Sequence, residues 1–381
     1  MLDNPVFWIV LSAAVVLVVV LVVVLRRDTT LEAIGIRRRP RPHRDDFRPE
    51  GTLGSATPLK RAGVIVNPTK FSDLPAVRQR ITAACGAHGW GEPIWYETTE
   101  ADPGTGQARR AAAEGAAVVC PLGGDGTVRA VAAALVGTET PLGLLPAGTG
   151  NLLARNLDLP VDSIERALGV ALTGQNVRID VGRLAVDPSG QHADPDQHIF
   201  LVMAGVGFDA AIMAGAPEAL KARVGSAAYL VSGMRNMLGP QFRVRLSVDG
   251  ETELSRRTRT VIIGNVGKLF GGLVLMPGAR FDDGLLDTVV LSPRGVVGWT
   301  ALAGHVVTRQ RRGHPLLDRH VGEEVRITTD RPQEVQLDGD PIGRARSITA
   351  TVDHLALVVR VGPTAAAAVT APGQASGAPP Q

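Results

Sequence analysis

Between residues 60 and 180 the sequence alternates short apolar segments with helical ones, and this alternation is the feature that most constrains the fold. The segments GVIVNP, PIWYETT, AAVVCPLG and PLGLLPAG have the composition of strands, and residues 74–88, 107–114 and 127–136 have the pattern of helices. Strands and helices in alternation predict a parallel sheet with helices on both faces. Sheets of this kind bind ligands at the carboxyl ends of their strands.

The pattern changes after Asp180, where strand-like segments follow one another with turn residues between them. They are VGRLAVD, HIFLVMAGVG, FRVRLSVDG, RTVIIGNV, LLDTVVLS, EVRITT and EVQLDG, with one helical stretch near residues 220–237. This predicts a second, mostly antiparallel β domain. The predicted fold class is therefore α/β plus β: a parallel α/β domain over 60–180 and a β-rich domain over 181–362, whose last strand could return to the first domain.

An apolar segment precedes both domains. Val6–Leu25 is a run of 20 residues in which Ser12 is the only polar side chain. As a helix it would be about 30 Å long, which matches the hydrocarbon thickness of a bilayer. We expect a retained transmembrane anchor at 6–25; a cleaved signal peptide is the alternative, but the leader MLDN lacks the basic residues of one.

The charges beside this run predict its orientation. Residues 26–48 contain eight arginines and four acidic residues, whereas Asp3 is the only charged side chain before the run. This bias predicts a single-pass protein of the cell membrane with its body in the cytoplasm. The whole chain has a net charge of only +3, so its positive charge is concentrated in this arginine segment. We expect the segment to contact anionic lipid headgroups, and we expect no nucleic-acid partner. Residues 26–59 are predicted to be a basic flexible tether and 363–381 a disordered tail.

Three polar loops follow strands of the first domain. They are NPTK, GGDGT and PAGTGN. GGDGT and PAGTGN each precede a helical pattern, and the free backbone N–H groups at the start of a helix favour an anion. Ordinary glycine turns are the alternative for any one loop, but three at one sheet edge predict a phosphate site. A P-loop is excluded because no GxxxxGK[ST] occurs, and a dinucleotide fingerprint fails because Leu153 stands at its third small position. The residues of the three loops that we expect at the phosphates are Asn67, Pro68, Thr69 and Lys70; Gly123, Gly124, Asp125, Gly126 and Thr127; and Gly148, Thr149 and Asn151.

These motifs, taken in order, resemble a known family. The segment GGDGT followed by PAGTGNLLARNL, with VNPT before them and RIDVGR, AGVGFDA, FDDGLLD and VQLDGDP after them, is similar to bacterial diacylglycerol kinases and sphingosine-kinase-like lipid kinases. The resemblance covers about residues 62–362. NAD kinases share GGDGT and the fold, but the PAGTGN loop has the lipid-kinase form.

The resemblance implies an NAD-kinase-like fold and an ATP-dependent kinase with its active site between the two domains. It places the ATP phosphates near the three loops and Thr99, with Asp125 in the central loop, and it makes Asp340 the general base that acts on a lipid hydroxyl. It also implies a structural Mg²⁺ held by the carbonyl groups of Arg280 and Leu285 and the side chain of Asp283.

The sequence departs from the family pattern at three positions. Asp340 stands where glutamate is usual, Arg129-Ala130 replace Asn-Glu after GGDGT, and Leu152 replaces an aspartate after Asn151. Since no P-loop lysine is present, we hypothesise that Lys70 and Arg129, together with Mg²⁺, supply the positive charge at the phosphates; Arg155 is a weaker candidate.

The resulting prediction is a membrane-anchored kinase that phosphorylates a membrane lipid, with diacylglycerol as the expected acceptor. A sphingoid base or a prenol-like alcohol is the alternative acceptor, because residues such as Phe208, Tyr229 and Leu230 fit a lipid site and a plain core equally well. A nucleotide-binding membrane protein without kinase activity is the alternative of another class, and a homodimer remains open.

Overall fold

The computed structural model describes residues 59–190, 195–207, 241–251, 254–268, 274–307, 315–363 and 366. The predicted anchor, nearly all of the tether, the helical stretch near 220–237, the tail and the three apolar residues at 208, 229 and 230 lie outside these ranges. Within them, no helix is both long enough and apolar enough to cross a bilayer.

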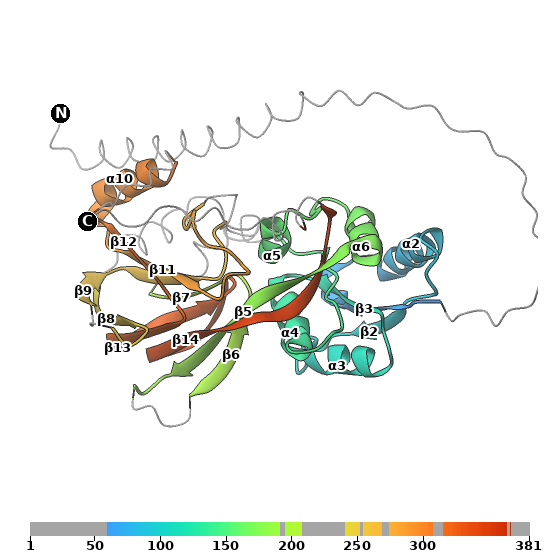
Figure 1. Ribbon diagram of the computed structural model, residues 1–381, viewed down its shortest axis with the longest axis horizontal. Helices are drawn as coiled ribbons and strands as arrows, with labels where there is room; N and C mark the ends of the chain where they lie inside the picture. The colour runs from blue at the N-terminus through green and yellow to red at the C-terminus, as the bar shows by residue number, and fades with distance from the viewer. Residues whose placement is uncertain are drawn as a thin grey trace, which may run out of the picture.

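The first domain is built on a parallel sheet in the order β2-β1-β3-β4 (Figure 1). Its strands alternate with helices as the sequence predicts. The elements are β1 (Ala62–Val66), the 3₁₀ turn η1 (Pro68–Lys70), α2 (Leu74–Ala87), β2 (Ile94–Glu97), α3 (Thr105–Ala113), β3 (Val118–Gly123), α4 (Asp125–Leu135), β4 (Leu145–Pro146), α5 (Leu152–Asn156) and α6 (Ile164–Thr173).

Helices cover both faces of this sheet, which explains why β1 is apolar and buried throughout. Side chains alternate between faces along a strand. Val64 and Val66 share one buried cluster with residues of α2 and α6, while Ile65 belongs to another with residues of α3 and α4. The two faces of β1 therefore build two different cores.

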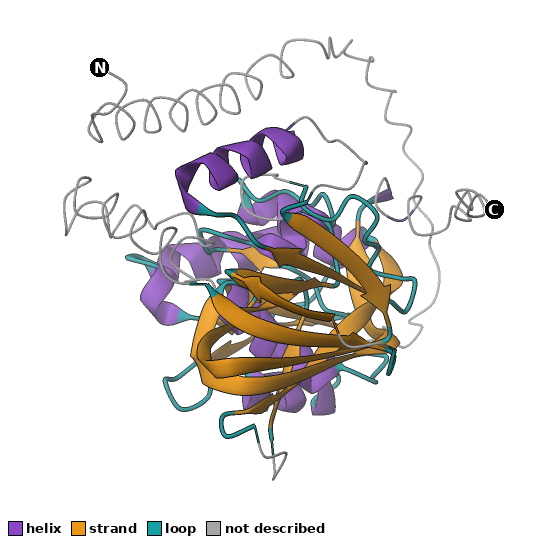
Figure 2. Ribbon diagram, turned by 90° about the vertical axis from the view of Figure 1, so that its left-hand side faces the viewer, coloured by secondary structure: helices purple, strands orange, loops and turns teal. Residues whose placement is uncertain are grey.

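The second domain is a ten-stranded, antiparallel sheet in the order β12-β11-β10-β7-β13-β14-β5-β6, with β8 and β9 branching from β13. Figure 2 shows these strands gathered in one lobe. Its elements are β5 (Gln175–Asp187), β6 (Asp196–Phe200), β7 (Met203–Val206), β8 (Phe242–Val248), β9 (Leu254–Thr258), β10 (Thr260–Gly264), β11 (Leu286–Leu291), α10 (Gly295–Val307), β12 (Leu317–Gly322), β13 (Glu324–Leu337) and β14 (Asp340–Val361).

Two long strands, β5 and β14, join the domains (Figure 1). They pair from Ser347–Asp187 to Val361–Gln175, and Val359 also forms a bridge with Leu142 of the first domain. The expected boundary between residues 180 and 181 therefore falls inside β5. One buried cluster contains residues from both domains, so the two sheets share a core.

Some strands differ from the predicted ones. EVRITT and EVQLDG were predicted as two strands, but EVRITT and the first part of EVQLDG lie in the single strand β13, which continues through the polar residues between them. The pairing of β13 with β14 shifts register there, between Thr328 and Gln333. The helix after GGDGT begins two residues earlier than expected, at Asp125. As a result the motif itself forms the first turn of α4.

Candidate active site

The GGDGT segment makes the turn from β3 into α4. Gly124 precedes the first helical residue, and no side chain caps this end of the helix. A Cβ atom at Gly123 would lie 2.7 Å from the Oγ1 atom of Thr127, and Thr127 is buried. Thr127 therefore packs against the end of β3. The groups of this turn that can bind an anion are the backbone N–H groups of residues 124–126.

The PAGTGN loop lies directly against this turn. A Cβ atom at Gly148 would be 2.7 Å from the Cα atom of Gly124, so only glycine allows this approach. Asn151 has a φ of 48°, in the left-handed region, and its amide group exchanges hydrogen bonds with the backbone of Gly148 at 3.0 and 2.8 Å. Thr149 is exposed at the tip of the loop, where its hydroxyl can reach a ligand.

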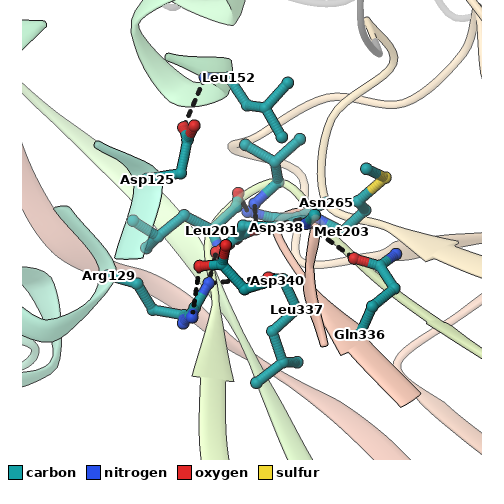
Figure 3. Close-up of polar contacts among 12 residues, drawn as sticks. Asp125, Arg129, Leu152, Leu201, Met203, Asn265, Gln336, Leu337, Asp338 and Asp340 are labelled. Atoms are coloured by element: carbon teal, nitrogen blue, oxygen red, sulfur yellow. Dashed lines mark hydrogen bonds and ion pairs between the residues drawn. The ribbon is translucent and has the colours of Figure 1, made fainter. Parts of the chain in front are cut away.

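Asp125 ties the two loops together. Its Oδ2 accepts a hydrogen bond from the Asn151 N–H at 2.9 Å. Its Oδ1 accepts one from the Leu152 N–H at 2.7 Å, which Figure 3 shows. Burial raises the pKa of Asp125 to about 6, although these two bonds oppose the shift. Both carboxylate oxygens thus accept hydrogen bonds from backbone N–H groups, and Asp125 links the GGDGT turn to the PAGTGN loop.

The first loop joins the same sheet edge through the backbone. The Asn67 N–H donates to the Leu122 carbonyl at 3.0 Å, and the Asn67 side chain accepts from the N–H and the hydroxyl of Thr69. Pro68 begins the 3₁₀ turn and Lys70 ends it, exposed to solvent. Thr99, after β2, closes a separate turn by accepting from the Asp102 N–H. Lys70 thus lies exposed at the end of the loop that follows β1, and its role at the phosphates stays a prediction.

Asp340 comes from the other domain, as the first residue of β14. A Cβ atom at Gly126 would lie 3.1 Å from the Asp340 Oδ2, so this carboxylate touches the GGDGT turn although it lies more than 200 residues away in sequence. The Asp340 side chain is 50% exposed. The structure thus brings the expected base and the central phosphate loop into contact.

The side chain of Arg129, which belongs to the first domain, contacts Asp340 of the second domain. Its Nη2 donates to the Asp340 Oδ2 at 3.0 Å, and its Nη1 donates to the Leu337 carbonyl at 2.8 Å (Figure 3). The guanidinium is directed at the turn between β13 and β14, and the hypothesis that Arg129 supplies positive charge to phosphate stays a prediction. The Arg155 Nε donates a hydrogen bond to the Gly150 carbonyl at 2.9 Å, and this bond links the PAGTGN loop to α5.

Asp338 is a site residue that the sequence did not single out. It has a φ of 49°, and its Oδ1 accepts hydrogen bonds from the N–H groups of Val202 and Met203 at 2.8 and 3.1 Å. The Arg129 Nη1 lies 3.6 Å from its Oδ2. Burial raises the pKa of Asp338, against the lowering effects of Arg129 and the backbone N–H groups. An Asp-Gly pair after an apolar strand was the available signal, and it also fits an ordinary turn.

The residues expected to hold a structural Mg²⁺ lie in the turn before β11. The Asp283 Oδ1 accepts from the Leu285 N–H at 3.1 Å, and Arg280 pairs with Asp282. Burial and the nearby Asp180 raise the pKa of Asp283. Within the described residues no group of three or more His, Cys, Asp or Glu side chains could hold a metal ion. A site here would therefore depend on backbone carbonyl groups and one carboxylate, and it stays a prediction.

Two family models match the chain, one to each domain. The diacylglycerol kinase catalytic domain matches residues 61–184, and the YegS C-terminal NAD kinase beta sandwich-like domain matches residues 202–363. The fold is therefore NAD-kinase-like, a parallel α/β domain followed by an antiparallel β-sandwich domain.

Two relatives and a solved structure agree with these matches. A "Probable lipid kinase YegS-like" protein of Cronobacter sakazakii is 33% identical over 258 residues, which cover 60% of this chain and 82% of the relative. A diacylglycerol kinase of Staphylococcus carnosus is 28% identical over 297 residues, covering 74% of this chain and 89% of the relative. The structure of a diacylglycerol kinase from Bacillus anthracis shares the fold, with a TM-score of 0.60 at 20% identity over 81% of this chain and 99% of that one. This chain belongs to the bacterial diacylglycerol kinase and YegS-like family and is a lipid kinase.

Proposed function

We propose that the protein transfers the γ-phosphate of ATP to the hydroxyl group of diacylglycerol and so forms phosphatidic acid. The observation that carries this proposal is the position of the Asp340 carboxylate beside Gly126, where an added Cβ atom would lie 3.1 Å from its Oδ2. Phosphoryl transfer needs phosphates held by backbone donors and a group that accepts the proton of the attacking hydroxyl. The structure places a half-exposed carboxylate of one domain beside a glycine turn of the other, which supports that combination.

The proposed reaction follows from this arrangement. The N–H groups of the GGDGT turn and the PAGTGN loop hold the phosphates, while Asp340 accepts the proton of the lipid hydroxyl. The hydroxyl oxygen forms a bond to the γ-phosphorus as the bond from that phosphorus to the β–γ bridging oxygen breaks, and ADP leaves. Lys70, exposed on the same sheet edge, adds positive charge near the phosphates.

We propose Mg²⁺ as the metal that accompanies ATP. Mg²⁺ commonly binds through substrate phosphates, water and one or two carboxylates. Asp125 uses both oxygens for backbone N–H groups and Asp340 is assigned to the proton of the hydroxyl, so the ion would be held mainly by the ATP phosphates and water. When bound, the ion neutralises negative charge on the phosphate oxygens.

The lipid acceptor places the reaction at a membrane surface. We propose that Val6–Leu25 anchors the enzyme there, because an enzyme tethered to the bilayer meets a bilayer substrate at high effective concentration. Extraction of cell membranes at alkaline pH tests this proposal: an anchored protein stays with the membrane, and a peripheral one is released.

Competition between acceptors tests the substrate. The full-length protein, ATP with a labelled γ-phosphate and Mg²⁺ are incubated in mixed micelles containing equal amounts of diacylglycerol, a sphingoid base and a prenol-like alcohol. We expect label mainly in phosphatidic acid. Label mainly in a sphingoid or prenyl phosphate would replace diacylglycerol with that acceptor and leave the lipid kinase assignment intact.

A further inference from the structure

Arg129 links the two halves of the active site. It lies in α4, just after the GGDGT turn, and its partners belong to the turn between β13 and β14. One guanidinium group reaches the carboxylate of Asp340 at 3.0 Å and the carbonyl of Leu337 at 2.8 Å, and it lies 3.6 Å from the carboxylate of Asp338. Three groups of one domain thus converge on a single side chain of the other.

The geometry of these contacts requires an arginine. The planar guanidinium presents several N–H donors in a fixed fork, whereas a lysine ammonium is a compact point charge on a flexible stem. The Arg129 side chain is only 17% exposed, and that of Asp338 is 3% exposed. Water therefore screens these contacts less than it screens ion pairs at the protein surface.

The position of the Asp340 carboxylate depends on a partner such as Arg129 more than the position of a buried side chain would. The Asp340 side chain is half exposed, so packing alone leaves its position underdetermined. Asp338, by contrast, is fixed by backbone N–H groups of residues 201–203. The Asp338 and Gly339 N–H groups bond the Met203 carbonyl and the Gln336 side chain at 2.8 and 2.7 Å. The turn is thus anchored within its own domain, and Arg129 is the side chain that ties it to α4.

We propose that Arg129 is a positioning residue for phosphoryl transfer: it holds the Asp340 carboxylate and the β13–β14 turn against the first turn of α4. The role in catalysis rests on the function proposed above. Because Arg129 and the phosphate-binding turn belong to one helix, the base and the phosphate site are held as a unit. A displacement of about 1 Å at a reacting group costs on the order of 100-fold in rate.

Steady-state kinetics of three variants test the catalytic part. Arg129→Ala is expected to lower kcat by about 100-fold while the KM for ATP changes by less than about threefold. Arg129→Lys keeps the charge without the fork and is expected to recover only part of the loss. Arg109→Ala removes an exposed arginine of α3 and serves as the matched control with wild-type kinetics.

Chemical rescue separates positioning from general stability. Guanidinium ions added at non-denaturing concentration are expected to restore part of the kcat of Arg129→Ala and to leave Arg109→Ala unchanged. A wild-type kcat in Arg129→Ala would overturn the proposal. A large rise in the KM for ATP with unchanged kcat would also overturn it, because Arg129 would then serve the nucleotide.

Hydrogen exchange tests the structural part without reference to any lipid. In Arg129→Ala the Asp338 and Gly339 amides are expected to exchange at least about tenfold faster than in Arg109→Ala, while the β1 amides stay protected. Unchanged exchange at residues 338 and 339 would overturn the proposal. If the wild-type protein labels no lipid, the proposed acceptor fails while the exchange experiment still decides whether Arg129 holds the turn.

Discussion

At the scale of single residues, the active site brings together three carboxylates and the guanidinium group of Arg129. Asp125, Asp338 and Asp340 lie close enough for the latter two to raise the pKa of the first, and Arg129 contacts both Asp338 and Asp340. Each carboxylate has a different environment, because Asp125 and Asp338 accept backbone N–H groups while Asp340 is half exposed. Of the three, Asp340 is therefore the carboxylate most open to solvent and to a ligand.

The raised pKa of Asp125 predicts a pH dependence of stability. Burial raises this pKa from 3.8 to about 6, so the folded protein holds the proton more tightly than the unfolded chain. The resulting stabilisation is full below about pH 4 and is lost as the pH rises through about 6. A shift of about two units corresponds to about 3 kcal/mol.

Urea unfolding of the wild-type protein and of Asp125→Asn across this range isolates the effect, because asparagine does not titrate. The free energy of unfolding of the wild type minus that of the variant should decrease by about 3 kcal/mol between about pH 4 and pH 7. A difference that stays constant over this range would show that the environment of Asp125 is not the one described.

The contact between Gly126 and Asp340 predicts the effect of a single methyl group. Gly126→Ala places a Cβ atom 3.1 Å from the Asp340 Oδ2, so the carboxylate must move by a few tenths of an ångström. We expect kcat to fall about tenfold without loss of stability, since alanine favours the helix. Gly86→Ala, in α2, meets nothing within 4 Å and is the control; equal kcat values in the two variants would contradict the contact.

The sequence predicted part of this site and missed the rest for a physical reason. Asp125 stands in a glycine-rich loop between a strand and a helix, and Asp340 stands in a motif that the resemblance to lipid kinases identifies, so both could be named before the fold is known. The role of Arg129 depends on a partner 211 residues away, and no local pattern encodes that contact. Asp338 was hidden because an aspartate before glycine is equally typical of a plain turn.

At the scale of elements, side-chain caps fix the first turns of α2 and α6. Asp73 caps α2 by accepting from the Ala76 N–H at 3.0 Å, and Ser163 caps α6 through the Arg166 N–H at 3.3 Å. Both helices share one buried cluster with β1 and β3, on the face opposite α4. Their caps therefore support the sheet without touching the active site.

This separation predicts a change in stability without a change in activity. Asp73→Ala should lower the free energy of unfolding by about 1 kcal/mol, the usual value of an N-terminal cap, with kcat unchanged. Asp73→Asn retains a side-chain oxygen that can accept the same hydrogen bond and should remain close to wild type. A loss of kcat in Asp73→Ala at full folding would show that α2 is coupled to the active site.

The predicted elements are most accurate where side chains follow a simple period. The strands of the first domain are short and buried, and their apolar runs identify them directly. No strand was predicted over the residues of β14, although a last strand returning to the first domain was allowed for. The register of β14 shifts between Asp353 and Leu357, where Leu355 has a φ of 50°, and this bulge breaks the alternation of its side chains.

At the scale of the whole molecule, the two domains are joined by β5, β14 and a common core. Leu357 and Val359 of β14 are fully buried in the cluster that also contains Ile65 of the first domain. A core of this kind links the stability of one sheet to that of the other. The active site lies at the same junction, so cooperative folding also maintains the distance between Asp340 and the phosphate loops.

This shared core predicts a single unfolding transition. Leu357→Ala removes a large side chain with no exposed surface and should lower the free energy of unfolding by about 2–5 kcal/mol. Hydrogen exchange in urea should show the amides of β1 and β10 losing protection together in this variant. Ile327→Ala, within the sandwich core, is the comparison; loss of protection in β10 alone in either variant would contradict a shared core.

The measurement that tests the central claim most directly is transfer of labelled γ-phosphate from ATP to diacylglycerol by three proteins. The wild type and Asp330→Asn, which changes an exposed aspartate of β13, should both form labelled phosphatidic acid. Asp340→Asn should form it about 1,000-fold more slowly, with a KM for ATP within about threefold of wild type. An Asp340→Asn protein with wild-type kcat would contradict the account, because the carboxylate beside Gly126 would then not be the proton acceptor.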